Sequence, residues 1–437
     1  MAVRISGVGC CLLDRIYGSV DFQSKEFTKY LSKKAGDGGL EPGKLTFEEE
    51  LERFAGQSFS SVILPQLTEG HKADKENVGG PCVVALINAA QLAYKESQVS
   101  FYGCRGDDEV GENLLQKLKQ TSLELSHYRI QKNSETASTS VLSDPNYDNG
   151  HGERTFVNTI GASWHYLPEE VDQSFYDSEI CVFGGTALVP RIHQGLNEML
   201  KKAKSKGCIT IVNTVYDFIS EKERPGERWR MGESDESYQF IDLLIVDHEE
   251  ALRLSGCEDI PSSIAFFREK GTGAVVVTNG AQNISLWAES PLFGSIKEQT
   301  MPVSEAVGKA LKAGKKGDST GCGDNFAGGI IGSLARQMFK GQLTTDNRQG
   351  TTDNGQGTTD NGQGTTDNGQ LTTDNRQGTT DNGQLPFDLK EACRWGIVSG
   401  GFACFYYGGT CFEEQEGEKF AHLQELYDLY LKQEGVC

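Results

Sequence analysis

The chain has 437 residues, enough for one large α/β domain or for two smaller domains. Hydrophobic residues make up 37% of it and charged residues 24%, which is the balance of a soluble globular protein. The formal net charge of −20 argues against a surface that binds nucleic acid or an anionic membrane, because either partner requires clustered Lys and Arg.

The N-terminus and the cysteines favour a cytoplasmic protein. The opening stretch MAVRISGVGCCLLDRIYG is too short and too interrupted for a signal peptide, and no apolar run approaches the length of a membrane span. The 12 cysteines form no CxxC pair and have no His partner at metal-ligand spacing. We therefore expect reduced, mostly buried thiols.

Short β-branched runs alternate with helical patterns along the chain. The strands that we expect are, in order, VRISGVGCCL, VSFYGC, EICVFGG, CITIVN, DLLIVD and AVVVTNG. Helical patterns between them include VGENLLQKLKQTSL, RIHQGLNEMLKKAKSKG and HEEALRLSG. This alternation predicts a mainly parallel sheet covered by helices on both faces, with ligands at the carboxyl ends of its strands.

Two stretches interrupt this alternation. Residues 15–77 are long and mixed, and residues 136–162 alternate like a two-stranded hairpin around a DNG turn. We expect both to form a lid over the site. For Arg154, in the hairpin, contact with a substrate oxygen or a phosphate is the alternative, but we expect this side chain to face water, as surface arginines usually do.

A low-complexity insertion occupies residues 342–385. It consists of tandem seven-residue units, QLTTDNR or QGTTDNG, each with at most one apolar residue, which excludes a coiled coil. Such a composition cannot bury enough surface to offset its ordering entropy, so we predict a disordered loop.

The stretch GDSTGCGDNFAGG, residues 317–329, is the most informative one. From Phe326 onward apolar residues recur at helical spacing, so residues 321–323, which we name the GCG turn, lie at a helix N-terminus. Free N–H groups and the helix dipole there would hold a phosphate. Asp324 would repel phosphate, unless it accepts a proton from a hydroxyl while the amides hold a γ-phosphoryl group. A plain helix-capping role for Asp324 is the alternative.

This stretch resembles DTxGAGDxFxAG, the signature of the PfkB/ribokinase family of carbohydrate kinases. Further family landmarks follow in the family's order, namely GVGCCLLD, NVGGPCVVALINAAQLA, GCRGDDEVGENLLQKL, DHEEALRL and VVVTNGAQN. The likeness covers residues 3–338 and, more loosely, 386–415. It implies a ribokinase-like three-layer α/β/α fold, a single domain over 1–437 with a mainly parallel central sheet and a small β lid.

The resemblance also implies site residues. The general base would be Asp324, and the anion hole would be formed by Gly321, Cys322 and Gly323. The nucleotide would be bound by Thr278, Gly280 and Asp318, Mg²⁺ by Glu250 and Asp247, and the substrate by Asp14, Gly79 and Gly80. Ordinary turn and capping roles stay open for Asp14, Gly79, Gly80 and Glu250. For Asp108 and Gly111 we prefer a plain turn that begins a helix.

Three positions depart from the family's pattern. Val84 stands where the family usually carries a substrate-binding Asn, and Asp247 stands where it carries another Asn. Asn283 replaces the last glycine of the nucleotide turn, a position that Asn tolerates because it adopts left-handed backbone more readily than most residues.

The activity implied is transfer of the γ-phosphoryl group of Mg·ATP to a primary alcohol of a carbohydrate. ATP and Mg²⁺ are the implied cofactors, with a monovalent cation as an optional third. A lid with few aromatic residues favours a sugar over a nucleoside. A nucleoside kinase, and a non-catalytic sugar- or nucleotide-binding protein, are the alternatives, and a homodimer through the lid is left open.

Overall fold

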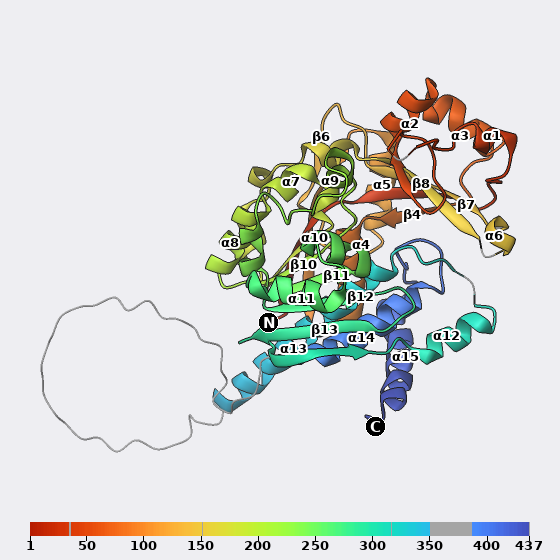
Figure 1. Ribbon diagram of the computed structural model, residues 1–437. Coiled ribbons are helices and arrows are strands. Elements are labelled where there is room, and N and C mark those ends of the chain that lie inside the picture. The colour runs from red at the N-terminus through yellow and green to blue at the C-terminus, as the bar shows by residue number, and fades with distance from the viewer. Residues whose placement is uncertain (35, 151, 316, 350–386, 437) are drawn as a thin grey trace, which may run out of the picture.

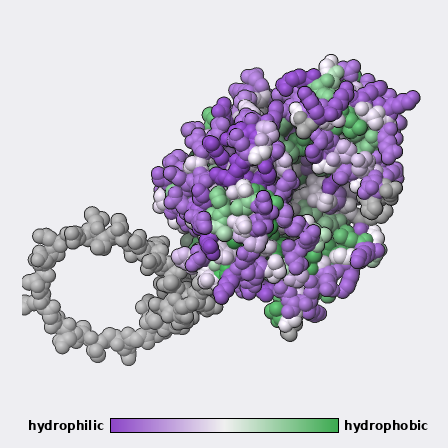
Figure 2. Space-filling view, viewed as in Figure 1, coloured by the Kyte–Doolittle hydropathy of each residue, from purple (hydrophilic) through white to green (hydrophobic). Residues whose placement is uncertain are grey.

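The computed structural model describes residues 1–34, 36–150, 152–315, 317–349 and 387–436. Within these residues the chain forms a nine-stranded main sheet, in the order β14-β13-β12-β11-β10-β9-β1-β5-β6, and a five-stranded second sheet (Figure 1). The face shown in Figure 2 is largely hydrophilic, in line with the net charge of −20.

The main sheet is mainly parallel, as the alternation of strands and helices predicts. Only β13 runs antiparallel, to both of its neighbours β12 and β14, among the described strands of this sheet. The strands are β1 (Val3–Gly9), β5 (Ser97–Gly106), β6 (Tyr128–Gln131), β9 (Ile180–Gly184), β10 (Ile209–Asn213), β11 (Leu243–Asp247), β12 (Ala274–Thr278), β13 (Ile284–Ser290) and β14 (Gly294–Met301).

Helices cover both faces of the main sheet. One face carries α4 (Pro81–Leu92), α5 (Glu109–Leu118), α13 (Cys322–Gln349), α14 (Leu389–Ala403) and α15 (Glu418–Glu434). The other carries α7 (Pro190–Gln194), α8 (Leu196–Ser205), α10 (His248–Ser255) and α11 (Ile260–Glu269). Side chains alternate along each strand, so Ile180 and Val182 join the first core while Cys181 and Phe183 join the second. The expected three-layer α/β/α fold is confirmed.

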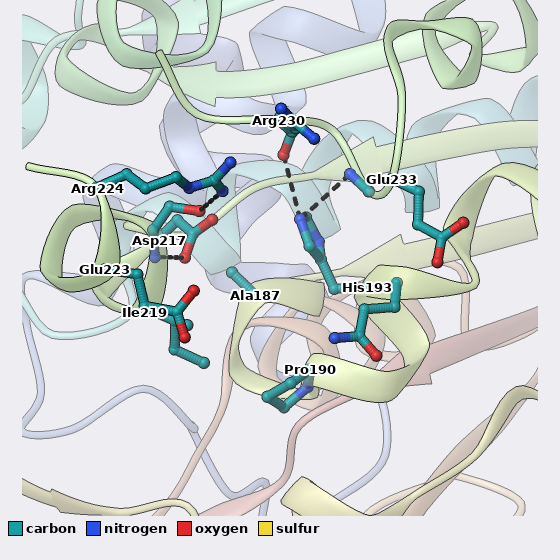
Figure 3. Close-up of a pocket in the computed structure, with 12 residues that line it drawn as sticks. Ala187, Pro190, His193, Asp217, Ile219, Glu223, Arg224, Arg230 and Glu233 are labelled. Atoms are coloured by element: carbon teal, nitrogen blue, oxygen red, sulfur yellow. Dashed lines mark hydrogen bonds between the residues drawn. The ribbon is translucent and has the colours of Figure 1, made fainter. Parts of the chain in front are cut away.

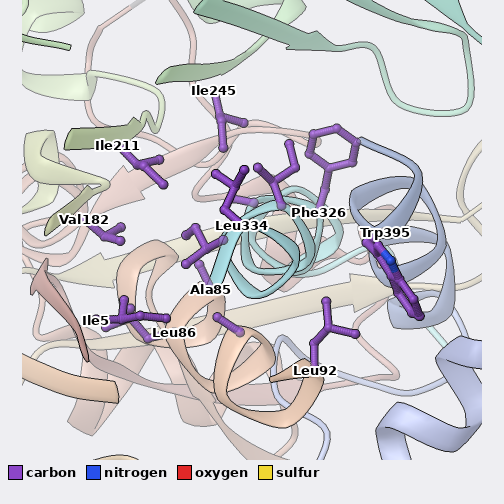
Figure 4. Close-up of a cluster of buried hydrophobic side chains, with 14 of the residues drawn as sticks. Ile5, Ala85, Leu86, Leu92, Val182, Ile211, Ile245, Phe326, Leu334 and Trp395 are labelled. Carbon is purple, nitrogen blue, oxygen red and sulfur yellow. The ribbon is translucent and has the colours of Figure 1, made fainter. Parts of the chain in front are cut away.

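Helix α13 is central to the first core, and its packing depends on glycine. Figure 4 shows Phe326 and Leu334 of α13 among side chains of α4, α14 and the main sheet. A Cβ at Gly328 would lie 2.3 Å from the carbonyl oxygen of Ala85 in α4, and one at Gly329 would lie 2.6 Å from that of Trp395 in α14. These close approaches fix where the N-terminus of α13 meets the edge of the sheet.

The predicted lid segments form the second sheet, which we name the lid sheet. Its order is β3-β8-β7-β2-β4, from β2 (Leu12–Tyr17), β3 (Leu45–Phe47), β4 (Lys75–Gly79), β7 (Ser138–Asp144) and β8 (Glu153–Thr159). The hairpin prediction is confirmed, because β7 and β8 pair antiparallel. Figure 1 shows the lid sheet with α1 (Lys25–Thr28), α2 (Glu48–Ala55), α3 (Leu64–Leu67) and α6 (Tyr147–Gly150) at one corner of the molecule.

The first predicted strand, VRISGVGCCL, is wrong as a single element. The chain leaves the main sheet after Gly9, where a Cβ would lie 2.2 Å from the carbonyl oxygen of Gly184, and Leu12 pairs with Gly79 in the lid sheet. Asp14 therefore lies on a lid strand instead of at the end of the first strand of the main sheet.

The predicted insertion over 342–385 lies mostly outside the described residues. Helix α13 continues to Gln349 and so includes the first seven-residue unit, and residues 350–386 lie beyond what the structure describes. Disorder of that stretch stays a prediction. In the described ranges, no helix combines the length and the apolar character needed to cross a bilayer.

The packing of α13 gives a first prediction. We expect Gly328→Ala to lower the free energy of unfolding by about 1–3 kcal/mol, because the added methyl group overpacks the contact with α4. The matched control is Gly308→Ala in α12 (Glu305–Lys312), where a Cβ would meet nothing within 4 Å. That control should raise stability by up to about 1 kcal/mol through helix propensity. Urea unfolding followed by circular dichroism measures both, and equal effects of the two substitutions would contradict this account.

Candidate active site

A cavity of about 160 Å³ lies between the lid sheet and the N-terminus of α13. Of the expected site residues it is lined by Asp14, Gly79, Gly80, Gly321 and Asp324. Strands β2 and β4 supply the first two, the N-cap of α4 is Gly80, and the last two come from the GDSTGCGD stretch. Residues separated by some 300 positions in the chain are thus brought to one cavity.

Asp324 lies in the first turn of α13, as its position after the GCG turn predicts. Burial raises the pKa of its carboxyl group to about 6. Gly321 has a φ of +73°, and a Cβ there would lie 2.5 Å from Cα of Gly409. Gly323 is exposed, and a Cβ there would meet nothing within 4 Å, so the backbone at this one position of the turn faces open space beside the carboxylate.

Asp14 is buried beside the glycine pair at the start of α4. A Cβ at Gly79 would lie 2.2 Å from Oδ2 of Asp14, so only glycine leaves room for this carboxylate. Burial, together with the negative charges of Asp318 and Asp324, raises the pKa of Asp14 to about 7. Its neighbour in the cavity is Val84, at the position where an Asn is usual.

Arg154 does not face water, so that expectation is wrong. Its guanidinium group donates from Nη1 to Oγ1 of Thr320 and from Nη2 to Oγ of Ser319, both at 2.6 Å. Nη1 also lies 3.8 Å from Oδ2 of Asp318. The side chain therefore joins β8 of the lid sheet to the residues just before the GCG turn. The hairpin was predictable, but its position against this stretch depends on the tertiary fold.

Asp318 anchors the backbone on both sides of the cavity. Its Oδ1 accepts hydrogen bonds from the N–H groups of Thr320, at 3.0 Å, and Gly408, at 3.2 Å. Residues 404–411, which we name the 404–411 loop, are thereby fixed against the GCG turn. In that loop Sγ of Cys404 lies 3.3 Å from Sγ of Cys322, and this contact lowers the pKa of Cys404 to about 7.

Asp247 and Glu250 form a capping box at the end of β11. Oδ1 of Asp247 accepts from the N–H of Glu250, and Oε2 of Glu250 accepts from the N–H of Asp247 and from the hydroxyl group of Thr214. Burial raises the pKa of both carboxyl groups, and the charge of Asp247 helps to raise that of Glu250 to about 8. Two neighbouring carboxyl groups with raised pKa suit a divalent cation, which would favour their ionised forms.

The expected nucleotide residues lie at the same edge of the main sheet. Thr278, at the end of β12, pairs with Asp247, and Gly280 follows with a φ of +54° and open space around its Cβ position. Asn283 has no positive φ, so its replacement of glycine causes no backbone strain. These residues, with Asp318, Glu250, Cys322 and Gly323, do not line the 160 Å³ cavity.

Residues 60–343 match the profile described as "pfkB family carbohydrate kinase". The chain belongs to this family. The match spans strands β4, β7 and β8 of the lid sheet, the capping box and the GCG turn, and so contains all the expected site residues except Asp14.

Individual pfkB relatives include two kinases of different specificity. The adenosine kinase of Schizosaccharomyces pombe is 22% identical over 265 residues, which cover 57% of this chain and 71% of the relative. The ribokinase of Haemophilus influenzae is 23% identical over 267 residues, which cover 59% of this chain and 74% of the relative. Family membership makes the chain a kinase and a phosphotransferase, and the two relatives differ in acceptor.

Solved structures share the fold. Adenosine kinase from Schistosoma mansoni, in complex with 2-fluoroadenosine, has a TM-score of 0.61 at 15% identity, covering 94% of this chain and 97% of that one. Ribokinase of Arabidopsis thaliana, complexed with ribose and ATP, has a TM-score of 0.57 at 14% identity, covering 98% and 99%. Each of these two likenesses covers more than nine tenths of this chain.

A larger cavity of about 440 Å³ lies beside α7 and α9 (Phe218–Glu223). In Figure 3 its lining residues include His193, Asp217, Arg224 and Arg230, with His193 Nε2 close to the carbonyl oxygen of Arg230. None of the expected catalytic or binding residues lines it. The residues that line the smaller cavity, and not its volume, therefore identify it as the candidate active site.

The sequence analysis missed several residues that line the smaller cavity. Phe156 and Asn158 lie on β8 two and four positions after Arg154, so all three share one face of the strand, and Thr139 lies on β7. The predicted hairpin contained this alternation, which was the available signal. Phe218 also lines the cavity, from a segment where no pattern pointed to it.

Glu250 gives a prediction about stability and pH. Because burial raises the pKa of its carboxyl group to about 8, the native state keeps this proton where the unfolded chain, near 4.5, has lost it. Wild-type stability therefore falls as the pH rises from about 4.5 to 8. Glu250→Gln should remove this loss and raise the free energy of unfolding at pH 8 by about 1 kcal/mol.

Thermal unfolding at pH 5 and pH 8 checks this, without added divalent cations. The matched control is Glu249→Gln, the exposed neighbour in the first turn of α10, which should change stability little at either pH. A Glu250→Gln protein that is less stable than wild type at pH 8 would contradict the assignment.

Proposed function

We propose that this kinase transfers the γ-phosphoryl group of Mg·ATP to a primary alcohol of a carbohydrate, with Asp324 as general base. One observation supports this most directly. The carboxylate of Asp324 shares a partly open, mainly apolar cavity with the buried Asp14, next to the open backbone at Gly323 of the GCG turn. Such a cavity holds an acceptor hydroxyl group between a base and an anion-binding helix terminus.

In this mechanism Asp324 accepts the proton of the acceptor hydroxyl group. A pKa of about 6 leaves the carboxylate ionised at neutral pH and still basic enough to take the proton in the transition state. The N–H groups of the GCG turn stabilise the charge on the phosphoryl oxygens. Asp14, with Thr139 and Asn158, would orient the other hydroxyl groups of the acceptor.

Nucleotide and metal would be held at the neighbouring strand ends. Thr278 and Gly280 would contact ATP, and Asp247 and Glu250 would hold Mg²⁺ through water. Bound Mg²⁺ neutralises phosphate charge. Within the described residues no group of three or more His, Cys, Asp and Glu could by itself hold a metal ion, which fits a Mg²⁺ held by few carboxylates, waters and phosphate. Asp318 would act as an anchor for the turn.

Arg154 would exchange its present partners for the transferred phosphoryl group. Its guanidinium group already lies against Ser319 and Thr320, directly before the turn. Arginine forms bidentate hydrogen bonds with phosphate, and this one belongs to the lid sheet. Its contact would therefore couple closure of the lid to neutralisation of the phosphate.

A nucleoside is the second candidate acceptor. Two aromatic rings, Phe156 and Phe218, line the cavity together with Leu12, Leu45 and Val215. An apolar wall of this kind suits a flat base better than a bare sugar, and one relative is an adenosine kinase. A non-catalytic binding protein is less well supported, because Asp324 and the GCG turn serve no purpose in binding alone. A homodimer through the lid, a monovalent cation and a cytoplasmic location stay predictions.

Turnover tests the function directly. Formation of ADP from Mg·ATP is measured against a panel of sugars, sugar acids and nucleosides. At least one should be phosphorylated, and Asp324→Asn should lower kcat by at least about a hundredfold. Below about pH 6, kcat should fall as Asp324 becomes protonated, because the base must be ionised. No turnover on any acceptor, with ATP bound tightly, would favour the non-catalytic reading.

Arg154→Met tests the lid contact. We expect kcat to fall at least about tenfold, because a charge that stabilises the transferred phosphoryl group is lost. The KM for the acceptor should change much less. Arg154→Lys should recover part of the rate, since it restores charge without the bidentate geometry. Arg53→Met, an exposed position on α2 of the lid, is the control and should leave kcat unchanged. A KM effect alone would contradict this role.

A further inference from the structure

A buried lysine lies behind the GCG turn. Lys419, in the first turn of α15, is 2% exposed, and its Nζ donates to Oδ1 of Asn325 at 2.8 Å. Asn325 directly follows Asp324 and is fully buried. No carboxylate in the described part of the chain forms an ion pair with this ammonium group. A buried ammonium without an ion-pair partner costs stability, so its presence needs a reason.

The amide of Asn325 is saturated with hydrogen bonds. Its Nδ2 donates to the carbonyl oxygens of Gly321, at 2.9 Å, and Gly409, at 2.8 Å. Its Oδ1 accepts from Lys419 and from the hydroxyl group of Tyr406, at 3.1 Å. An ammonium group can only donate, so it fixes which end of the amide is the oxygen and leaves the NH₂ group for the two glycines.

These contacts join the two backbones that line the cavity. Gly321 begins the GCG turn and Gly409 belongs to the 404–411 loop, and they are packed so closely that a Cβ at Gly321 would lie 2.5 Å from Cα of Gly409. A rotation of the Asn325 amide would place its oxygen against both carbonyl groups and push them apart. The direction in which the N–H groups of the GCG turn point therefore depends on the orientation of the Asn325 side chain.

We propose that Lys419 is a positioning residue for phosphoryl transfer. Its charge locks the amide of Asn325, and that amide holds the GCG turn in the geometry that receives the phosphoryl group. The expected effect on kcat rests on the proposed function. The effect on the geometry of the GCG turn does not depend on that function.

The charge of Lys419 is sensitive to pH. Burial lowers the pKa of its ammonium group to about 8, while Cys411 and Glu413 raise it in part. Those two groups, with the ring of Tyr406 at 5.8 Å, are the titratable and charged surroundings that face it. Above this pH a neutral amine no longer fixes the amide. The unfolded chain keeps its proton up to about 10.5, so native stability rises over the same interval in which rate is lost.

The first experiment compares Lys419→Met with Lys432→Met, an exposed lysine on the same helix. Two readouts are taken, hydrogen–deuterium exchange of the peptide spanning 317–329 and kcat as a function of pH. In Lys419→Met we expect exchange in this peptide to accelerate about tenfold and kcat to fall about tenfold, with thermal stability no lower than in wild type. In the wild type we expect kcat to fall above about pH 8, where Lys419 loses its proton, and this fall should be absent in Lys419→Met. Lys432→Met should match wild type throughout.

A second variant keeps the inference testable if Lys419→Met does not fold. Asn325→Asp keeps an oxygen for Lys419, with which it forms an ion pair, but cannot donate to either glycine carbonyl. It should accelerate exchange in the same peptide, and adding Lys419→Met should not accelerate it further. Unchanged exchange in the 317–329 peptide of both folded single variants overturns the inference, whatever the kinetics. Faster exchange in both variants, together with a wild type that phosphorylates no acceptor, would leave the positioning intact and overturn the proposed function instead.

Discussion

Four carboxyl groups gathered around the start of α13 are the constraint on which the rest of this structure depends. Asp14, Asp324, Asp247 and Glu250 all have a raised pKa, and burial is the main cause for each. Gathering them costs folding free energy, which the large core around α13 and α4 must supply. The N-terminus of α13, pointed at them by its glycine contacts, provides a compensating positive potential. The fold thus loses free energy of unfolding at the place where these carboxyl groups are buried.

The two sheets are connected tightly enough to make one site. The chain crosses from β1 to β2 over two residues, so Asp14 belongs to the lid sheet while the residues up to Gly9 belong to the main sheet. Asn77 of β4 donates to the carbonyl oxygens of Tyr407 and Thr410, and Arg154 of β8 reaches the residues before the GCG turn. The lid thus contacts both backbones beside the cavity. A shift of the lid sheet would act directly on the groups that we propose to bind phosphate.

Local signals in the sequence predicted the main elements because they depend on neighbouring residues. Period-two and helical patterns gave the parallel strands, the β7–β8 hairpin and α13, and the Gly-rich stretch gave the position of Asp324. Contacts between distant segments were not predictable. The partners of Arg154 lie some 165 residues away, and Lys419 lies 94 residues after Asn325. The break after Gly9 was missed for the same reason, since an unbroken run of small and apolar residues over 7–13 hides a change of sheet.

The sulfur atoms of Cys322 and Cys404 give the turn a property that the rest of the site does not share. At 3.3 Å they are in contact but unbonded, whereas a disulfide bond is about 2.05 Å long. Formation of that bond would draw the 404–411 loop and the start of α13 together by more than an ångström. The geometry described here is therefore that of the reduced form of this cysteine pair, and the spacing between the GCG turn and the 404–411 loop depends on the oxidation state of the pair.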